Sequence, residues 1–355
     1  MKAFITGGNG FIGSALIKAL EARGDEITCL MYPGTKADWL ASPAVTFIEG
    51  DITAPNDAMK DAIEEADLIF HLAGARIGLT SAHFYRVNAG GTQELLSVCR
   101  KRWKQALEQE TNTKRFILVS SATVSGPCER DDPSPEERIN PLTPYAKSKV
   151  ESERIALEEF SDIPVTVIRP TAIYGPRTTE WVALLEASLR WRIHLKMGVF
   201  HNAHVNFCHV DDLVRAMLLA AENKEAIGEA FHIGGFEYNW TDLGFYVSKH
   251  LGKKTMTIRM PIPILFLAAG ATHILSWFIR QPFEFNWWRA VDFSQKNWLF
   301  RLDKAKEILG YEPQITLDEG GGSTLRWFFE NEWVTNWGGK KYVPPAVLPA
   351  KQDRK

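Results

Sequence analysis

The chain has 355 residues, of which 45% are hydrophobic and 24% charged, so it can bury a large core in one large or two smaller globular domains. A formal net charge of −2 gives no general attraction to nucleic acid, which we exclude as a partner. The four cysteines lie far apart with no Cys-x-x-Cys pair, so we predict no disulfide framework and no metal site, as in a protein of the reducing cytoplasm.

A glycine-rich turn follows the first apolar run, Ala3–Ile5, which we predict to be a buried strand. Gly7, Gly10 and Gly13 are three residues apart and open a helical pattern of apolar residues. Without side chains there, the chain can turn tightly and let a pyrophosphate approach the helix N-terminus. The alternative is a turn that only reverses the chain. We predict a dinucleotide phosphate site that uses Gly7, Gly10, Phe11 and Ile12.

Short apolar runs alternate with amphipathic helices through the first half of the chain. This alternation predicts an α/β fold of the Rossmann type, a doubly wound parallel sheet with helices on both faces. A long helix is predicted from an Asn88 cap to about Gln109. Further strands are predicted at Ile27–Met31, Val45–Ile48, Asp67–Leu72 and Arg115–Ser120. The carboxyl ends of parallel strands share one crevice, which should collect Gly7, Asp51, Ala73 and Ser120, with Asp51 placed to accept from an adenine amino group.

Tyr145 and Lys149 are four residues apart in a helical pattern, so they share one helix face about one turn apart. A free tyrosine has a pKa of about 10, too high for a general base near neutral pH, and a nearby ammonium group favours the tyrosinate. Ser121 is placed to hold a substrate oxygen against the Tyr145 hydroxyl while a nicotinamide gives or takes a hydride. Tyr-x-x-x-Lys also occurs by chance in helices, so the pair alone does not identify an enzyme.

Several motifs occur in a fixed order along the chain. They are Thr6-Gly-x-x-Gly-x-x-Gly13, Gly50-Asp51, His71-Leu-Ala-Gly74, Asn88-x-x-Gly-Thr92, Ser120-Ser-Ala-x-Val-x-Gly126, Tyr145-x-x-x-Lys149, Arg169-Pro170, Tyr174-Gly-Pro176 and His209-Val-Asp-Asp212. In this order they resemble the extended short-chain dehydrogenase/reductases of the NAD-dependent epimerase/dehydratase type. The resemblance runs from Met1 to about Trp333.

This resemblance implies that Ser121, Tyr145 and Lys149 form the catalytic set, with Lys149 also bonding the nicotinamide ribose. It also implies a homodimer that pairs through the helix bearing Tyr145. Ser125 departs from the pattern, since many relatives have Tyr there, and we expect this to alter the pocket wall more than the chemistry. The further coenzyme contacts implied are Ile52, Leu72, Ala73, Gly74, Asn88, Ser120, Pro170 and Thr171.

The end of the second strand should select the coenzyme, with Asp for a free ribose hydroxyl or Arg for a 2′-phosphate. Met31 and Tyr32 are neither. With no carboxylate to repel a phosphate, and with Lys36 close by, we favour NADP over NAD and expect Tyr32 and Lys36 to contact the coenzyme. The alternative is that Lys36 is simply solvated and NAD is used.

We expect residues 1–173 and 205–235 to form the coenzyme domain, residues 174–204 and 236–335 a smaller, mostly helical substrate lobe, and residues 336–355 a tail. Ten of the twelve tryptophans lie from Trp181 onward, either packing the lobe or lining an apolar cavity. The segment Ile262–Ile279 contains no Asp, Glu, Lys or Arg and approaches the length of a bilayer span. We favour a buried helix of the lobe; the alternatives are an interfacial patch giving peripheral membrane contact, or a true span.

Nucleotide-sugar enzymes of the family usually have Asn at the position of Ala172 and Arg-Asp at the positions of Val205-Asn206, and this chain lacks those residues. Without these donors a diphosphate would lack hydrogen-bond partners.

The chain looks more like the 3β-hydroxysteroid dehydrogenase and dihydroflavonol reductase branch. We therefore predict an NAD(P)-dependent oxidoreductase acting on an apolar alcohol or ketone. The alternatives are a nucleotide-sugar epimerase or dehydratase with retained coenzyme, and a non-catalytic coenzyme-binding protein. The predicted substrate contacts are Ala122, Thr123, Ala172 and Arg177.

Overall fold

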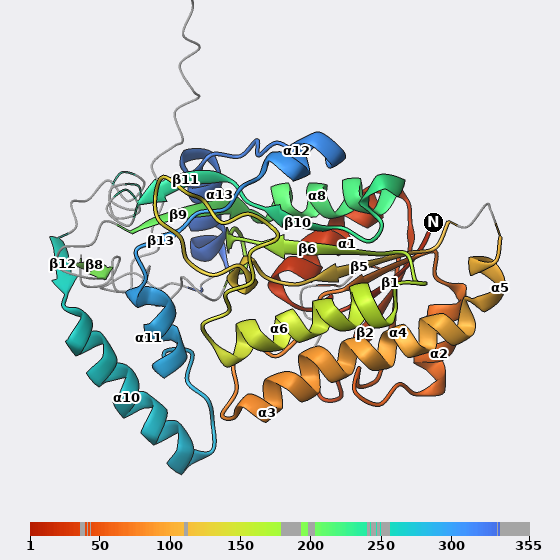
Figure 1. Cartoon of the computed structure of the whole chain (residues 1–355), viewed down its shortest axis with the longest axis horizontal. Coiled ribbons are helices and arrows are strands. Elements are labelled where there is room, and N and C mark those ends of the chain that lie inside the picture. The colour runs from red at the N-terminus through yellow and green to blue at the C-terminus, as the bar shows by residue number, and fades with distance from the viewer. Residues whose placement is uncertain are drawn as a thin grey trace, which may run out of the picture.

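The computed structural model describes residues 1–35, 40, 42, 44–109, 113–178, 193–197, 203–239, 242, 246, 249, 256–331 and 333. At its centre is a parallel seven-stranded sheet in the order β10-β6-β5-β4-β1-β2-β3 (Figure 1). The strand order reverses between β1 and β4, which is the place where such sheets bind ligands. The strands are β1 (Lys2–Thr6), β2 (Glu26–Met31), β3 (Val45–Glu49), β4 (Leu68–His71), β5 (Arg115–Val119), β6 (Val165–Pro170) and β10 (Ala230–Ile233).

Successive strand residues enter two separate cores, one on each face of the sheet, because side chains alternate along a strand. Ile5 and Phe70 belong to one core, and Phe4 and Ile69 belong to the other. Since both faces are covered, the strands read as continuous apolar runs, and the predicted Rossmann fold is confirmed. The first core is covered by α1 (Phe11–Arg23), α8 (Val210–Glu222) and α12 (Asp303–Leu309), and the second by α2 (Asp57–Glu65), α4 (Gly91–Arg102), α6 (Pro144–Arg154) and η3 (Ile155–Glu159).

The helix predicted to begin at an Asn88 cap begins earlier, so that prediction was wrong. Thr80 caps α3 (Ser81–Phe84) by accepting from the His83 N–H, and the helix continues through a π-helical turn, η1 (Tyr85–Gly90), into α4. Asn88 is buried inside this turn, where its side chain bonds the backbone of Ala75. A partner distant in sequence therefore replaces the local bond that a cap would make. After Arg102 only a short helix follows, α5 (Lys104–Leu107).

The second half of the chain adds a smaller sheet and further helices beside the carboxyl edge of the large sheet (Figure 1). In the smaller sheet β9 pairs with β7, β11 and β13. A separate pair joins β8 to β12. The elements are β7 (Ala172–Tyr174), β8 (Ile193–Met197), β9 (His204–His209), β11 (Phe236–Asn239), β12 (Met256–Met260), α10 (Ile262–Ile279), α11 (Trp287–Ser294), β13 (Asn297–Trp298) and α13 (Leu317–Glu330), with single turns η2 (Ala122–Val124) and η4 (Lys224–Ala226).

Helix α10 lies along the outer edge of the molecule, with α11 between it and the large sheet (Figure 1). Within the part of the chain that the structure describes, it is the helix long and apolar enough to cross a membrane, with a mean hydropathy of 1.8. Only Leu265, Ala269 and Ser276 are buried in it, so the favoured interpretation of a buried helix was wrong. The hydropathy of a segment measures how favourable its transfer out of water is. It does not tell whether other parts of the fold pack against the segment and bury it.

Candidate active site

The glycine turn after β1 is closed by contacts that leave no room for side chains. Gly7 adopts a φ of +74°, and a Cβ there would lie 2.7 Å from the Ala73 nitrogen. A Cβ on Gly13 would lie 2.3 Å from the Gly7 carbonyl oxygen. Gly10 is the N-cap of α1, and because it has no side chain, no side-chain capping bond occupies the first N–H groups of the helix. The first N–H groups of α1 are therefore available to an anion, as at a pyrophosphate site.

A cavity of about 460 Å³ opens beside this turn, at the carboxyl ends of β1, β4, β5 and β6. It brings together the predicted catalytic residues Ser121, Tyr145 and Lys149. The predicted coenzyme and substrate residues that also line it are Gly7, Gly10, Phe11, Ile12, Leu72, Gly74, Ser120, Pro170, Thr171, Ala122, Thr123 and Ala172.

Lys149 is buried on α6, and its Nζ donates to the Val119 carbonyl oxygen at 2.8 Å. Burial lowers the pKa of Lys149 to about 8, and the negative charge of Glu153 opposes this only in part. A Cβ on Gly74 would lie 3.5 Å from the Lys149 Nζ, so glycine keeps the space beside the amine open. Lys149 thus presents a partly desolvated ammonium group to the cavity.

Asn88 lies behind the part of the cavity formed by Gly74 and Lys149, and it holds the first turn of α6 in place. Its Nδ2 donates to the Ser148 Oγ at 2.9 Å, and Ser148 donates to the Tyr145 carbonyl oxygen at 2.7 Å. Its Oδ1 accepts from the Ala75 N–H at 2.7 Å. Asn88 does not line the cavity. Its contacts suit a positioning role rather than direct contact with a ligand.

Tyr145 follows Pro144 in the first turn of α6, which Thr143 caps by accepting from the Ala146 N–H. The Tyr145 ring contacts the edge of Phe84, with 6.3 Å between the ring centroids. Ser121, at the end of β5, shares a hydrogen bond of 2.9 Å between its Oγ and the Thr123 Oγ1. A hydroxyl pair and a phenol therefore meet at one cavity, where an alcohol or carbonyl oxygen has both a donor and an acceptor available.

His71 at the end of β4 is a buried, neutral imidazole. Burial, together with the Lys149 charge, lowers its pKa to about 3. Thr92 donates to the Asn88 carbonyl oxygen at 2.7 Å, so the His71 Nε2–H donates to Thr92 Oγ1 and the Nδ1 accepts from Thr6. This chain of bonds ties β1, β4 and α4 together beneath the cavity and does not itself line it.

Three buried hydroxyls that line the cavity have no hydrogen-bond partner among the described residues. They are Ser120 Oγ and Thr171 Oγ1, at the ends of β5 and β6, and Thr178 Oγ1, which follows β7. An orphaned buried hydroxyl costs free energy unless a ligand completes its bonding. The glycine cradle at α1 and these hydroxyls fit a dinucleotide: the N-terminus of α1 would hold its phosphates, and Ser120 and Thr171 would bond its polar groups.

The other predicted contacts within the described residues do not line the cavity. Tyr32 is exposed after β2. Asp51 follows β3, and its Oδ1 accepts from the N–H and the Oγ1 of Thr53. Arg177 is half-buried in a left-handed backbone conformation, and burial lowers its pKa. Ile52 belongs to the core over the second sheet face, Ala73 is half-buried against that core, and Lys36 falls outside the described residues.

The opposite wall of the cavity comes from a segment that the motifs do not cover. Arg76 and Glu284 line it and form an ion pair at 2.7 Å. Trp288 contacts Phe84 edge to face, with 5.5 Å between ring centroids. No sequence motif pointed to this wall; the one local signal is Asn286, which caps α11. The wall residues from this segment are Glu284, Asn286, Trp288, Arg289, Asp292, Phe293, Gln295, Trp298 and Phe300.

Arg169 and Ser125 lie behind the cavity and do not line it. Arg169 forms a buried ion pair with Glu153, with 2.6 Å between Nη2 and Oε2. Ser125 is fully buried and bonds His232, with 2.9 Å between Oγ and Nε2. The expectation that Ser125 alters the pocket wall was wrong, because its hydroxyl is used inside the protein.

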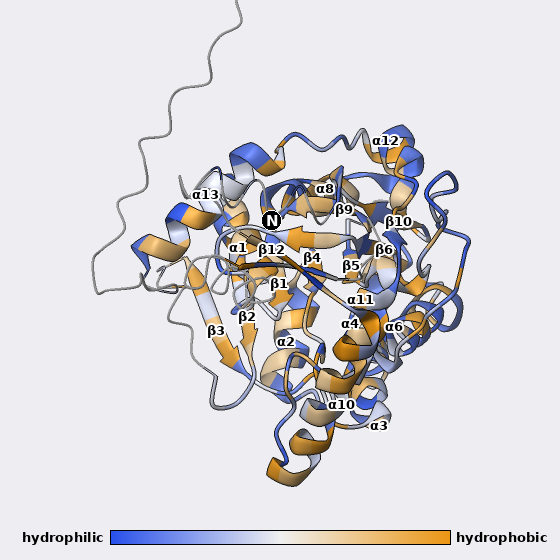
Figure 2. Cartoon of the chain, turned by 90° about the vertical axis from the view of Figure 1, so that its left-hand side faces the viewer, coloured by the Kyte–Doolittle hydropathy of each residue, from blue (hydrophilic) through white to orange (hydrophobic). Residues whose placement is uncertain are grey.

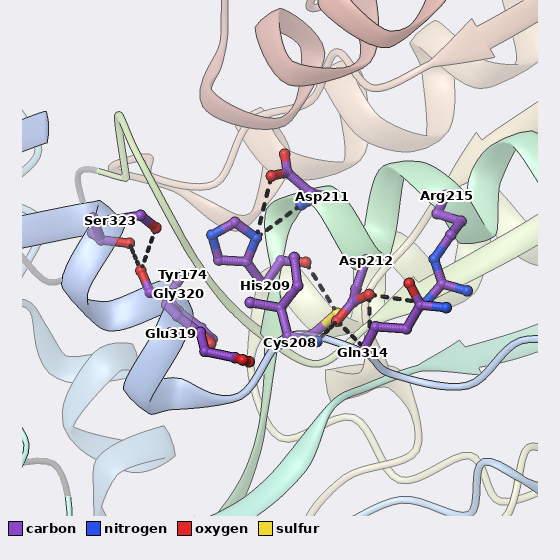
Figure 3. Close-up of polar contacts among 12 residues, drawn as sticks. Tyr174, Cys208, His209, Asp211, Asp212, Arg215, Gln314, Glu319, Gly320 and Ser323 are labelled. Atoms are coloured by element: carbon purple, nitrogen blue, oxygen red, sulfur yellow. Dashed lines mark hydrogen bonds and ion pairs between the residues drawn. The ribbon is translucent and has the colours of Figure 1, made fainter. Parts of the chain in front are cut away.

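The His209-Val-Asp-Asp212 motif is also structural. Asp212 at the start of α8 accepts from the N–H groups of Gln314 and Ile315 and pairs with Arg215 at 2.8 Å (Figure 3). A Cβ on Gly320 would lie 2.6 Å from the His209 ring, so α13 packs closely at this point. The motif therefore joins late segments of the chain to α8, which covers one face of the large sheet.

Comparison with known proteins identifies the class. The model of the NAD dependent epimerase/dehydratase family matches residues 3–234, and the chain belongs to this family. It is therefore an NAD-dependent enzyme of the extended short-chain dehydrogenase/reductase type, as the motifs predicted.

Three proteins that are similar to this chain illustrate the different activities named within that class. A sterol-4-alpha-carboxylate 3-dehydrogenase, decarboxylating, of Mus musculus is 27% identical over an alignment of 345 positions, which covers 92% of this chain and 91% of that protein. A ceramide reductase of Caulobacter vibrioides is 25% identical over 332 residues, 93% of this chain and 95% of that protein. The structure of a UDP-glucose 4-epimerase of Thermotoga maritima with UDP-glucose has a TM-score of 0.72 at 24% identity, covers 94% of this chain and 100% of that chain, and shares the fold.

Proposed function

We propose that the protein is an NAD(P)-dependent oxidoreductase that interconverts a secondary alcohol and a ketone on an apolar, steroid-, flavonoid- or lipid-like molecule. The observation that carries the proposal is the wall that faces Ser121 and Tyr145. Trp288, Phe293 and Phe84 present aromatic surface to the cavity, as an apolar ring system or acyl chain requires. The similarity to relatives named for sterol and ceramide substrates supports the same class.

In the proposed reaction, the nicotinamide supplies or accepts a hydride when it is bound. In the oxidative direction the carbinol C–H bond breaks and its electron pair leaves with the hydride. The hydroxyl proton passes to Tyr145, and the C=O bond forms. In reduction, Tyr145 returns its phenolic proton to the carbonyl oxygen. Ser121 holds that oxygen, and the Lys149 ammonium group favours the tyrosinate.

We propose NADP as the preferred coenzyme. The residues at the end of β2 itself, buried Met31 and exposed Tyr32, carry no carboxylate that would repel a 2′-phosphate; the strand neighbour of Met31 on β3 is Glu49. Lys36 is the cation we assign to that phosphate. Titration calorimetry with NADPH and NADH, on the wild type and on Lys36→Glu, tests this. Equal affinity of the wild type for both coenzymes would refute the preference.

A second candidate is a nucleotide-sugar epimerase or dehydratase that retains its coenzyme. Besides Lys149, two cations, Arg76 and Arg289, line the cavity and favour an anionic group on the substrate. Against it, Arg76 is already paired with Glu284. Full occupancy of co-purified coenzyme, with no net change in its absorbance on turnover, would support this candidate.

The test combines a ligand screen with one conservative variant. Thermal shifts with coenzyme present should favour steroid-like, flavonoid and long-chain ketones over UDP-, GDP- and dTDP-sugars. On the best ligand, Tyr145→Phe should lower turnover by about 10² or more while coenzyme still binds. Tyr85→Phe, at an exposed tyrosine outside the cavity, is the matched control. Normal turnover by Tyr145→Phe would remove Tyr145 as the acid/base.

The remaining assignments stay predictions of the same proposal. Residues 1–173 and 205–235 form the coenzyme domain, and residues 174–204 and 236–335 the substrate lobe. A homodimer pairs through α6. The protein works in the cytoplasm at a membrane surface, which α10 contacts.

A further inference from the structure

The exposed face of α10 is as apolar as its buried face. Ile264, Leu267, Ala271, Ile274 and Phe278 are exposed and follow the three- and four-residue spacing of one helix face. Leu267 is 76% and Phe278 is 81% exposed. A soluble helix normally places polar residues on this side. In Figure 2 the ribbon of this helix projects from the body of the molecule and carries the colour of hydrophobic residues along its length.

Each end of α10 has an arginine, and the next acid along the chain after the helix, Glu284, is paired with Arg76. Arg259 lies three residues before the helix and Arg280 is its C-cap, and both are exposed. The helix itself contains no Asp, Glu, Lys or Arg. An apolar stripe with arginines at its ends matches a bilayer surface that contains anionic lipids, where the stripe enters the acyl region and the arginines stay at the headgroups.

The side contacts of α10 favour a helix that lies in the interface over one that crosses the bilayer. Eighteen residues give a helix of about 27 Å, slightly less than a hydrocarbon core of about 30 Å. Thr272 donates to the Phe285 carbonyl oxygen at 2.8 Å, and Ser276 accepts from the Phe283 N–H at 3.3 Å. These bonds tie the middle of α10 to the returning chain, and a span would have to break them or bury them in lipid.

The inner side of α10 connects this surface to the catalytic cavity. His273 of α10 contacts Trp288 of α11, with 5.4 Å between ring centroids. Trp288 contacts Phe84, and Phe84 contacts Tyr145. Phe293 of α11 packs against the α10 cluster and also lines the cavity. One continuous set of aromatic side chains therefore runs from the exposed helix to the predicted acid/base.

We propose that α10 docks the enzyme flat on an anionic bilayer surface and that an apolar substrate passes from the lipid along α11 into the cavity. The helix inserts the face that contains Leu267 and Phe278, while Arg259 and Arg280 meet lipid headgroups. The route of the substrate rests on the proposed function, whereas the docking does not. Vesicle binding without substrate therefore tests docking alone.

The experiment is co-sedimentation of the full chain with sucrose-loaded vesicles of phosphatidylcholine, with or without phosphatidylglycerol. The wild type should pellet with the vesicles, and more strongly when they are anionic. The double variant Leu267→Asp with Phe278→Asp should bind at least about 100-fold more weakly, because each buried apolar side chain contributes about tenfold or more. Arg259→Gln with Arg280→Gln should lose the preference for anionic vesicles and retain weaker binding to neutral ones.

Phe47→Asp with Ile227→Asp is the matched control, since it places the same charges at two exposed apolar positions away from α10. It should bind vesicles like the wild type. Coenzyme affinity confirms that each variant is folded, and Leu267→Ser with Phe278→Ser replaces the aspartate pair if that pair fails to fold. Three results would overturn the proposal: wild type that stays in the supernatant with both vesicle types, α10 variants that still pellet, or a wild-type dimer that the α10 variant converts to monomer. Resistance of the bound wild type to alkaline carbonate extraction would overturn the flat orientation.

Discussion

Alanine substitutions at Gly10 and Gly13 separate two requirements of the turn after β1: the space that folding needs and the space that coenzyme binding needs. At Gly10 an added Cβ meets only the Gly7 carbonyl oxygen, at 3.2 Å, so Gly10→Ala should fold and lose about 1 kcal/mol or less. If the pyrophosphate binds at the N-terminus of α1, the added methyl group would crowd it. Losing one charged hydrogen bond there costs about 1.5 to 3 kcal/mol, which is a roughly 10- to 100-fold loss of coenzyme affinity.

At Gly13 the added Cβ would lie 2.3 Å from the Gly7 oxygen and 2.6 Å from the Gly8 Cα, and neither backbone atom can move alone. Gly13→Ala should therefore lower the free energy of unfolding by about 3 kcal/mol. Gly270→Ala is the control, because its Cβ meets nothing within 4 Å and alanine favours a helix by up to about 1 kcal/mol. Denaturant unfolding and titration calorimetry measure the two effects. Wild-type coenzyme affinity in a folded Gly10→Ala protein would refute the phosphate site.

Three further variants test residues that line the cavity or lie behind it. The pKa of Lys149 is about 8 in the folded protein against 10.5 for the free side chain, so holding its proton lowers the stability of the fold at neutral pH. As the pH rises from about 8 to 10.5, the free energy of unfolding of the wild type should therefore increase, relative to Lys149→Met, by up to about 1.4 kcal/mol per pH unit. Denaturant unfolding measures this difference. Asn88→Ala leaves the Ala75 N–H unpaired and should cost about 1 to 3 kcal/mol of stability, with lower turnover that Asn88→Ser does not restore. Glu284→Gln removes the negative charge that pairs with Arg76 and should tighten binding of anionic apolar ligands by less than about tenfold in a thermal-shift titration, since a half-exposed pair contributes little.

The sequence predicted the parts of the site that depend on local rules. The turn at Gly7 and Gly13 is specified by backbone space, and the pairing of Tyr145 with Lys149 follows from helical spacing. Ser121 could be placed because the carboxyl ends of parallel strands share an edge. Each of these inferences uses residues that are neighbours in sequence or in a regular element, so motif order was sufficient.

The sequence did not predict the parts that depend on docking between distant segments. Asn88 has the side chain of a helix cap, but its partner is Ala75 across a π-helical turn. Glu284 and Trp288 reach the cavity only because the segment after α10 folds back over α3, and no local pattern encodes that contact. For α10 the composition is equally compatible with a core, an interface and a span. The difference lies in whether the rest of the fold covers it.

The buried ion pair between Arg169 and Glu153 shows how a family motif can be structural. The Arg169 Nε and Nη2 donate to the Glu153 carboxylate, its Nη1 donates to the Glu136 carbonyl oxygen, and both side chains of the ion pair are about 95% buried. Arg169→Met would leave a buried carboxylate without its partner. This should lower the free energy of unfolding by about 3 to 5 kcal/mol.

Adding Glu153→Leu to Arg169→Met removes the unpaired charge and should restore most of that loss, because an apolar pair of similar volume avoids the desolvation of both ions. Arg100→Met, which breaks a surface pair with Asp162, should cost no more than about 1 kcal/mol and controls for the loss of an arginine. Denaturant unfolding gives all three values. If Arg169→Met were as stable as Arg100→Met and instead lost coenzyme or substrate affinity, Arg169 would act at the site rather than in the fold.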